Sequence, residues 1–261
     1  MDRFNYWWRL SVTGGCFAAF GVGGMLLSTL IFPAMRLLPG RPQIRSRRAK
    51  FMIHKLFSAL VWLLRYLGVM RLETHNVEAL RNAGPVIVLA NHPTYIDVVV
   101  LISCMPYANC IVKSALWKNP FYGGVVRAAG YLSNDNPDAL IDACVASLAE
   151  GTPLIIFPEG TRTVPGQPLR FVRGAAHIAL KSRACIQPVV IHCDPPTLAK
   201  GGKWYTIPPK RFCFSISVRP PLDVADVNGA DEPNSIAARK LTEELERYFT
   251  RELITHESTI A

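Results

Sequence analysis

The sequence predicts an α/β fold, a single domain with a largely parallel or mixed central sheet flanked by helices and preceded by N-terminal membrane-associated helices. Two short apolar runs, residues 86–90 and 153–157, are each followed at once by a polar segment. Such runs are typical of strands buried on both faces of a parallel sheet, although a buried helix gives the same pattern. A third observation is the uncharged stretch of residues 10–35. We therefore expect a membrane-anchoring basic helical region at residues 1–72 and the α/β domain at residues 73–261.

The N-terminal stretch has the length of a membrane anchor. The 26 residues from Leu10 to Met35 carry no charge, and as a helix they would extend about 39 Å, more than the ~30 Å hydrocarbon layer. Tyr6, Trp7 and Trp8 stand where an interfacial aromatic belt is expected. Glycine and hydroxyl residues lower its hydropathy, so a re-entrant or interfacial hairpin is an alternative to a full span. A cleavable signal peptide is disfavoured because no small-x-small cleavage site follows.

Positive charge is concentrated in the same region. The chain has 29 Lys and Arg against 19 Asp and Glu, a net charge of +10, yet residues 3–72 contain no acidic residue. The basic cluster over residues 36–50 follows the apolar stretch, which by the positive-inside rule predicts an N-terminal anchor with the domain on the cytoplasmic face of the inner or plasma membrane. Nucleic-acid binding is disfavoured as an interpretation of this charge, because the basic residues flank apolar segments and no nucleic-acid motif is present.

A basic amphipathic helix is predicted over residues 51–70, where apolar residues recur at helical spacing. Such a helix would lie in the membrane interface, or pack onto the α/β domain, or do both. The other predicted elements are helices over 138–150, 174–183 and 235–253, strands over 186–191 and 212–218, and a polar connector over 223–233.

Seven cysteines at scattered positions form no Cys-x-x-Cys pair, which disfavours a disulfide framework. We also expect no metal and no bound cofactor, because the sequence contains no ligand cluster with the spacing of a zinc site.

The polar segments that follow the two apolar runs are Asn91–Asp97 and Phe157–Arg162. If the two strands are parallel, both segments lie at one edge of the sheet, where ligands bind in open α/β folds. A histidine with a nearby carboxylate, here His92 and Asp97, is suited to taking a proton from a substrate. Alone, this pair would more often be structural; the second segment favours an active site.

The two segments together resemble the glycerolipid acyltransferase family, particularly lysophosphatidate acyltransferases. The resemblance rests on a His-x4-Asp box at His92 and Asp97, followed about 60 residues later by Phe-Pro-Glu-Gly-Thr-Arg at 157–162. It extends from about Val86 to Ile191 and includes the segment Lys113–Gly123. It implies an enzyme that moves a fatty acyl group from acyl-CoA or acyl carrier protein, as co-substrate, to the hydroxyl of a lysophospholipid such as 1-acyl-glycerol-3-phosphate. Residues 73–261 would then be an acyltransferase domain.

The resemblance also implies roles for individual residues. His92 would be the catalytic base and Asp97 the residue that orients it. Glu159 and Arg162 are expected to bind the acceptor, Gly160 and Thr161 to contact substrate within the same turn, and Lys113 to assist with an anionic group. A backbone N–H of Gly160 is also a candidate donor to the oxyanion of the reaction intermediate.

One departure from the family pattern affects the acceptor. Many lysophosphatidate acyltransferases carry an arginine shortly after the glycine that matches Gly130. This chain instead has Tyr131–Asn136 there, with no basic residue. Either Arg162, Lys113 or Arg173 holds a phosphate, or the acceptor is a glycolipid or specialised lipid used with a carrier-protein donor. A thioester or ester hydrolase and a non-catalytic lipid-binding scaffold are the other functional alternatives. The expected partners are the lipid bilayer, a lipid acceptor and the acyl donor.

Overall fold

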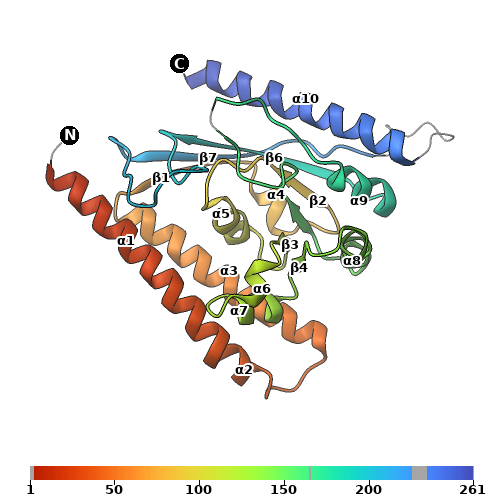
Figure 1. Cartoon of the computed structure of the whole chain (residues 1–261), viewed down its shortest axis with the longest axis horizontal. Helices are drawn as coiled ribbons and strands as arrows, with labels where there is room; N and C mark the ends of the chain where they lie inside the picture. The colour runs from red at the N-terminus through yellow and green to blue at the C-terminus, as the bar shows by residue number, and fades with distance from the viewer. Residues whose placement is uncertain (1–2, 165, 225–233, 261) are drawn as a thin grey trace.

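A seven-stranded mixed sheet lies at the centre of the computed structural model, which describes residues 3–164, 166–224 and 234–260 (Figure 1). The strands are β1 Met70–His75, β2 Ile87–Ala90, β3 Asn109–Val112, β4 Leu132–Ser133, β5 Leu154–Ile156, β6 Ile186–Asp194 and β7 Phe212–Val218. Their order is β1-β7-β6-β2-β5-β3-β4, and all neighbours are parallel except β6 and β7. The predicted fold class is confirmed. The polar connector expected at 223–233 lies largely outside the described residues.

Helices cover both faces of this sheet. They are α1 Arg3–Leu26, a π-helical turn Leu27–Ile31, α2 Phe32–Met35, α3 Pro42–Tyr66, α4 Glu78–Arg81, α5 Asp97–Cys104, α6 Ala115–Lys118, α7 Gly123–Ala129, α8 Pro137–Ala149, α9 Gly174–Ser182 and α10 Asn234–Ile260. In Figure 1, α9 and α10 lie on one side of the sheet, and α1, α3 and α5 lie on the other.

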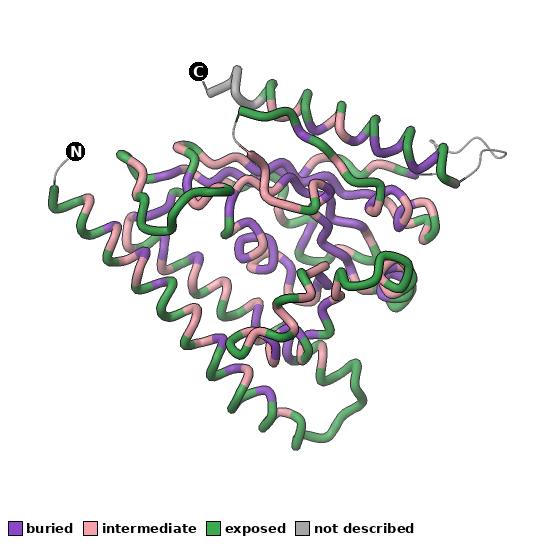
Figure 2. Tube along the Cα trace, in the orientation of Figure 1, coloured by how far each residue is buried: buried purple, intermediate pink, exposed green. Residues whose placement is uncertain are grey.

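Strand β2 contributes to a hydrophobic core on each face. Val88 and Ala90 belong to the cluster on the α3 and α5 side, whereas Ile87 and Leu89 belong to the cluster beneath α8, α9 and α10. All four are fully buried, as the purple trace through the centre of Figure 2 shows. Full burial of one aliphatic side chain contributes about 1.5 to 3 kcal/mol, which explains why this run is apolar throughout instead of alternating.

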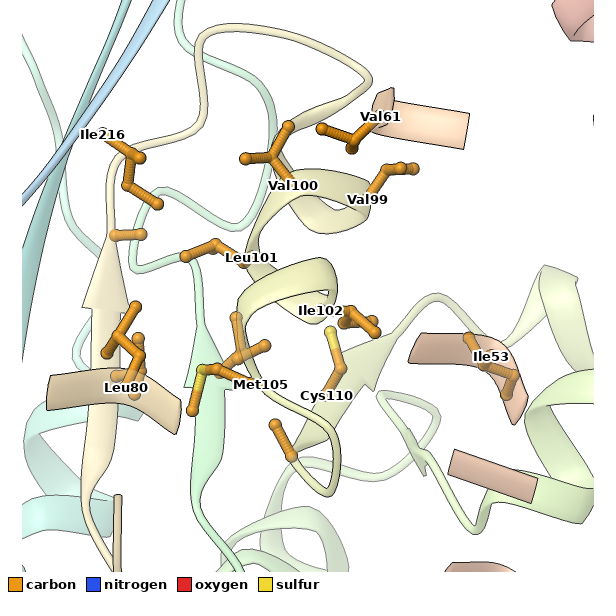
Figure 3. Packing of buried hydrophobic residues seen from close by; sticks show 14 of the residues in the cluster. Ile53, Val61, Leu80, Val99, Val100, Leu101, Ile102, Met105, Cys110 and Ile216 are labelled. Atoms are coloured by element: carbon orange, nitrogen blue, oxygen red, sulfur yellow. The ribbon is translucent and has the colours of Figure 1, made fainter. Parts of the chain in front are cut away.

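Helix α5 lies between the sheet and α3, so the core on this face has two helical layers. Figure 3 shows Val99 of α5 against Val61 of α3, while Leu101 points away toward the strands. Both α5 side chains are buried. Because α5 begins at Asp97, this packing fixes the first turn of the helix that carries the candidate catalytic carboxylate.

The predicted helices are present with altered ends. Helix α8 matches the expected 138–150 closely, because the Asn136 side chain accepts hydrogen bonds from the N–H groups of Asp138 and Ala139 at its start. The bounds predicted for the helix over 51–70 are wrong at both ends. The helix begins at Pro42, a residue suited to a first helical turn, and ends at Tyr66, so that Met70 pairs in β1.

Helix α1 with its continuation is long and apolar enough to cross a membrane by length and composition, the only such helix among the described residues. It is nevertheless in contact with the domain along its length. Near its start the Trp8 indole N–H donates to the Leu67 carbonyl (3.0 Å), and the Phe20 ring lies 5.3 Å from that of Tyr122. Beyond its end, Ser28 donates to the Phe121 carbonyl (2.8 Å).

The contact at Ser28 is close enough to require a glycine. A Cβ atom on Gly124 of α7 would lie 2.6 Å from the Ser28 Cα, which no side chain tolerates without movement of the backbone. The N-terminal helices therefore share one core with the sheet. The proposed boundary between residues 72 and 73 stays a prediction.

Candidate active site

Asn91, the first residue after β2, anchors the candidate catalytic loop to the neighbouring strand. Its side-chain amide donates to the Ile191 carbonyl and accepts from the Ile191 N–H, both at 2.8 Å. Asn91 is buried. A side chain that satisfies both polar groups of a buried strand residue replaces two ladder hydrogen bonds, so the position of His92 relative to β6 is fixed.

The imidazole of His92 is held by Asp97. Its Nδ1 donates to Asp97 Oδ2 at 2.7 Å, a short charge-assisted bond. The His92 side chain is 18% exposed and that of Asp97 is fully buried. Because Nδ1 carries the proton shared with the carboxylate, Nε2 is the ring nitrogen available to accept a proton from a substrate.

Thr94 donates two further hydrogen bonds to the carboxylate of Asp97. Its N–H donates to Asp97 Oδ2 (2.8 Å) and its hydroxyl donates to Oδ1 (2.6 Å). Burial raises the pKa of Asp97, and the bonds from His92 and Thr94 act in the opposite direction. With three donors facing it, the carboxylate has a single orientation, with Oδ2 toward the imidazole.

The second predicted segment lies beside the first, because β2 and β5 are adjacent and parallel. Glu159 Oε1 accepts from the backbone N–H of His92 (2.9 Å) and from the Thr163 hydroxyl (2.8 Å). The Thr163 N–H donates to the His92 carbonyl (2.7 Å). The main chain of His92 is thus bonded on both sides to the turn that follows β5.

The same turn supplies a ring that supports the imidazole. Phe157 stacks on His92 with 4.2 Å between ring centroids and 25° between planes. Burial raises the pKa of Glu159, against the bonds from His92 and Thr163. Gly160 has φ +65°, which explains a glycine there, but its N–H donates to the Phe157 carbonyl. That N–H is used within the turn and is not directed at a substrate.

Arg162 is half-buried at the same edge and contacts the segment that follows β6. Its Nη1 donates to the carbonyls of Leu198 (3.0 Å) and Ala199 (2.8 Å), and its guanidinium lies over the Tyr95 ring at 3.6 Å. Tyr95 also donates its N–H to the Leu198 carbonyl (3.3 Å). Arg162 therefore joins the candidate catalytic loop to residues 195–211.

An apolar cavity of about 130 Å³ opens directly behind this loop. Tyr95 and Ile96, which stand between His92 and Asp97 in the sequence, form part of its wall. The remaining wall comes from α1, α3, α5 and the 195–212 segment, with Cys16, Phe17, Leu60, Val99, Trp204 and Phe212 among the lining residues. Apolar ligand surface is the chemistry that this cavity matches.

The remaining predicted residues lie at the periphery. Lys113 follows β3 at the same edge of the sheet, two strands from β2, and is exposed. Thr161 is half-buried within the turn, and Arg173 is exposed just before α9. In the segment after Gly130, where the family arginine is missing, Asn136 caps α8. Among the described residues, no group of three His, Cys, Asp or Glu side chains is placed to hold a metal ion.

Asn91, Thr94 and Thr163 were not singled out from the sequence, although each bonds directly to a predicted site residue or holds its loop. A signal for Thr94 was present: Thr-x-x-Asp before an apolar run is the pattern of a capping box, in which the acidic side chain accepts from the backbone N–H three residues earlier. Asp97 and Thr94 make that bond.

Comparison with known proteins gives one family. The model of the Acyltransferase family matches residues 71–192. A 1-acyl-sn-glycerol-3-phosphate acyltransferase of Helicobacter pylori is 36% identical over 117 residues, which cover 42% of this chain and 49% of the relative. A Cocos nucifera protein of the same name is 28% identical, covering 64% of this chain and 55% of the relative. The chain therefore spans about half the length of these relatives.

Among solved structures, the 1-acyl-sn-glycerophosphate acyltransferase PlsC from Thermotoga maritima is similar with a TM-score of 0.67. The alignment covers 94% of this chain and 99% of that chain at 20% sequence identity. At this level of identity the likeness establishes a common fold.

Proposed function

We propose that this chain is a glycerolipid acyltransferase, which transfers a fatty acyl group from acyl-CoA or acyl carrier protein to the hydroxyl of a lysophospholipid such as 1-acyl-glycerol-3-phosphate; the match to the Acyltransferase family and the similar relatives support this. The observation that carries the proposal is the 2.7 Å bond between His92 Nδ1 and Asp97 Oδ2, beside an apolar cavity. Thioester carbon, acceptor oxygen and base can meet at this edge of the sheet.

The chemical step follows from the free nitrogen of His92. Nε2 takes the proton of the acceptor hydroxyl while the oxygen attacks the thioester carbonyl and the new C–O bond forms. Collapse of the tetrahedral intermediate breaks the C–S bond, and the imidazolium returns the proton to the departing thiolate. Asp97 stabilises the imidazolium between the two events. Neither an acyl-enzyme nor a metal ion is required by this sequence of steps.

Arg162 is the residue that we assign to an anionic acceptor. A guanidinium presents five N–H donors in one plane. In Arg162 the donors on Nη1 already bind the carbonyls of Leu198 and Ala199. The remaining donors are suited to phosphate. Lys113, two strands away and exposed, can add charge at longer range but makes no contact with His92 among the described residues.

The test is thiol release from a long-chain acyl thioester by the purified protein. We expect release to depend on an added lysophospholipid, with 1-acyl-glycerol-3-phosphate compared directly with an unphosphorylated acceptor of the same chain length. Release that is independent of any acceptor would instead indicate a hydrolase. An absence of release with both CoA and carrier-protein thioesters would indicate a lipid-binding scaffold.

We also propose that α1 holds the protein in the membrane interface without crossing it. Contacts at Arg9, Phe20 and Ser28 join α1 and the turn after it to the domain near the start of the helix, at its middle and beyond its end. The helix also presents exposed apolar side chains, with Phe4, Trp7 and Val22 among them. A helix that is apolar on its free face and packed on the other is suited to lie in the lipid headgroup region. The basic cluster over residues 36–50 supports a location on the cytoplasmic leaflet, because the anionic lipids of that leaflet attract basic segments.

Cysteine labelling distinguishes this arrangement from a full span. Phe4→Cys and Leu38→Cys introduce thiols at exposed positions before and after the apolar stretch. With protein bound to the outside of vesicles, an impermeant maleimide is expected to label both from the outside, above the background of the unsubstituted protein. Protection of one position alone, lifted when detergent opens the vesicles, would show that the segment crosses the bilayer.

A further inference from the structure

Glu159 contacts the candidate base itself, a fact that its expected role in acceptor binding does not explain. Its Oε1 accepts two hydrogen bonds, from the His92 N–H at 2.9 Å and from the Thr163 hydroxyl at 2.8 Å. The Thr163 N–H donates to the His92 carbonyl at 2.7 Å. Three bonds thus form a closed cycle between one turn and the main chain of one residue.

The cycle fixes the part of His92 that its other contacts leave free. Asp97 holds the ring at Nδ1, and Phe157 supports one ring face. Neither contact holds the main chain of His92, which Asn91 ties to β6 only through the preceding residue, and a rotation of the ring about Nδ1 would change the direction of Nε2. The bonds to the N–H and C=O groups of His92 remove that freedom, because they fix the backbone from which the side chain projects.

The charge and burial of Glu159 strengthen the hydrogen bonds that it accepts in this cycle. Glu159 is half-buried, and burial raises its pKa while the bonds from His92 and Thr163 act against that rise. Bonds to an ionised acceptor are about twice as strong as neutral ones. A carboxylate whose oxygen is committed to two protein donors in this way is poorly placed to serve as an acceptor ligand with the same atom.

We propose that Glu159 and Thr163 are positioning residues, which set the direction of His92 Nε2 through its main chain. The inference rests on the proposed acyl transfer for its kinetic consequence but not for its structural one. Displacement of a catalytic group by about 1 Å can lower a rate about 10²-fold, so the cycle is important even though it touches no reacting atom.

Two matched pairs of variants test the proposal by kinetics. In Glu159→Gln the side-chain oxygen can still accept from the His92 N–H and the Thr163 hydroxyl, whereas Glu159→Ala loses both bonds. We expect Glu159→Ala to lower kcat about 10²-fold with little change in the KM for the acceptor, and Glu159→Gln to lower kcat less than about tenfold. Thr163→Ser is expected to resemble wild type, and Thr163→Val to lower kcat, because only the serine keeps the hydroxyl. A raised acceptor KM with unchanged kcat in Glu159→Gln would overturn the proposal.

An NMR measurement that requires no turnover separates this inference from the proposed function. The Nδ1–H resonance of His92, identified by its loss in His92→Gln, is expected to shift and broaden in Glu159→Ala and to stay at its wild-type position in Glu159→Gln. An unchanged resonance in a folded Glu159→Ala protein would refute the positioning role. If the resonance responds as expected while wild-type protein shows no acceptor-dependent thiol release, the positioning role holds and the acyl transfer fails.

Discussion

Replacement of His92 by alanine is expected to lower kcat for acyl transfer by about 10²- to 10⁴-fold, the usual contribution of a general base. An alcohol is a poor nucleophile until its proton is removed, and Nε2 of His92 is the proton acceptor that the site provides. Asp97 is fully buried behind the ring and cannot replace it. The measurement is acceptor-dependent thiol release at saturating donor and acceptor, which reports the chemical step and not binding.

Two controls make the result specific. His75 is exposed on β1, so His75→Ala should retain wild-type activity and shows that removal of a histidine is harmless in itself. His92→Gln keeps a polar side chain of similar size but offers no nitrogen base, so it should be as inactive as His92→Ala. Substantial transfer by a folded His92→Gln protein would show that another group removes the proton.

The strands that carry the site were predictable because their pattern is local. The run 86–90 has apolar side chains at every position, which indicates burial on both faces, and β2 has that burial. Parallel neighbours then place their following residues at one edge, so the meeting of His92 with Glu159 and Arg162 followed from chain direction alone. The structure brings these residues together as expected, while their roles stay proposals.

Other features depend on contacts between distant parts of the chain. Strand β1 pairs with β7, about 140 residues later, and nothing within Met70–His75 indicates that partner. The bond from His92 N–H to Glu159 is likewise between a backbone group and a remote side chain. A motif shows which residue types are present but not whether a carboxylate faces the substrate or the protein, so Glu159 resembled an acceptor ligand from its sequence context.

Asp97 gives the second large effect, and here alanine and asparagine should differ in both rate and stability. Asp97→Ala removes the acceptor of the His92 Nδ1–H, so the ring loses its orientation and the imidazolium loses its counter-charge. It also leaves the buried N–H and hydroxyl of Thr94 without their acceptor. We expect a loss of kcat comparable to that of His92→Ala, and a stability loss of about 1 to 3 kcal/mol for each unsatisfied donor.

Asp97→Asn should have a milder effect than Asp97→Ala, because Thr94 determines the orientation of the asparagine amide. Two N–H donors, from His92 and Thr94, face the position of Oδ2, so the amide oxygen belongs there. The amide NH₂ then faces the Thr94 oxygen, which can accept from it as well as from the Ile96 N–H, but the Thr94 O–H loses its acceptor. The His92 tautomer is kept, while the negative charge and the bond donated by the Thr94 O–H are lost. Because a hydrogen bond to a charged group is worth about 1.5 to 3 kcal/mol, we expect kcat to fall about 10- to 10²-fold.

The pH dependence of stability tests whether the buried charge of Asp97 costs folding free energy. Burial raises the pKa of Asp97, so the folded protein binds this proton more tightly than the unfolded chain does. Stability therefore falls as pH rises through the raised pKa, and the ionised carboxylate is a cost to folding. Asp97→Asn removes that pH-dependent cost, so its melting temperature relative to that of wild type should be highest at pH 8 and should fall as the pH is lowered through the raised pKa. If Asp97→Asn instead melts as far below wild type as Asp97→Ala, the buried charge stabilises the fold and this reading of Asp97 is wrong.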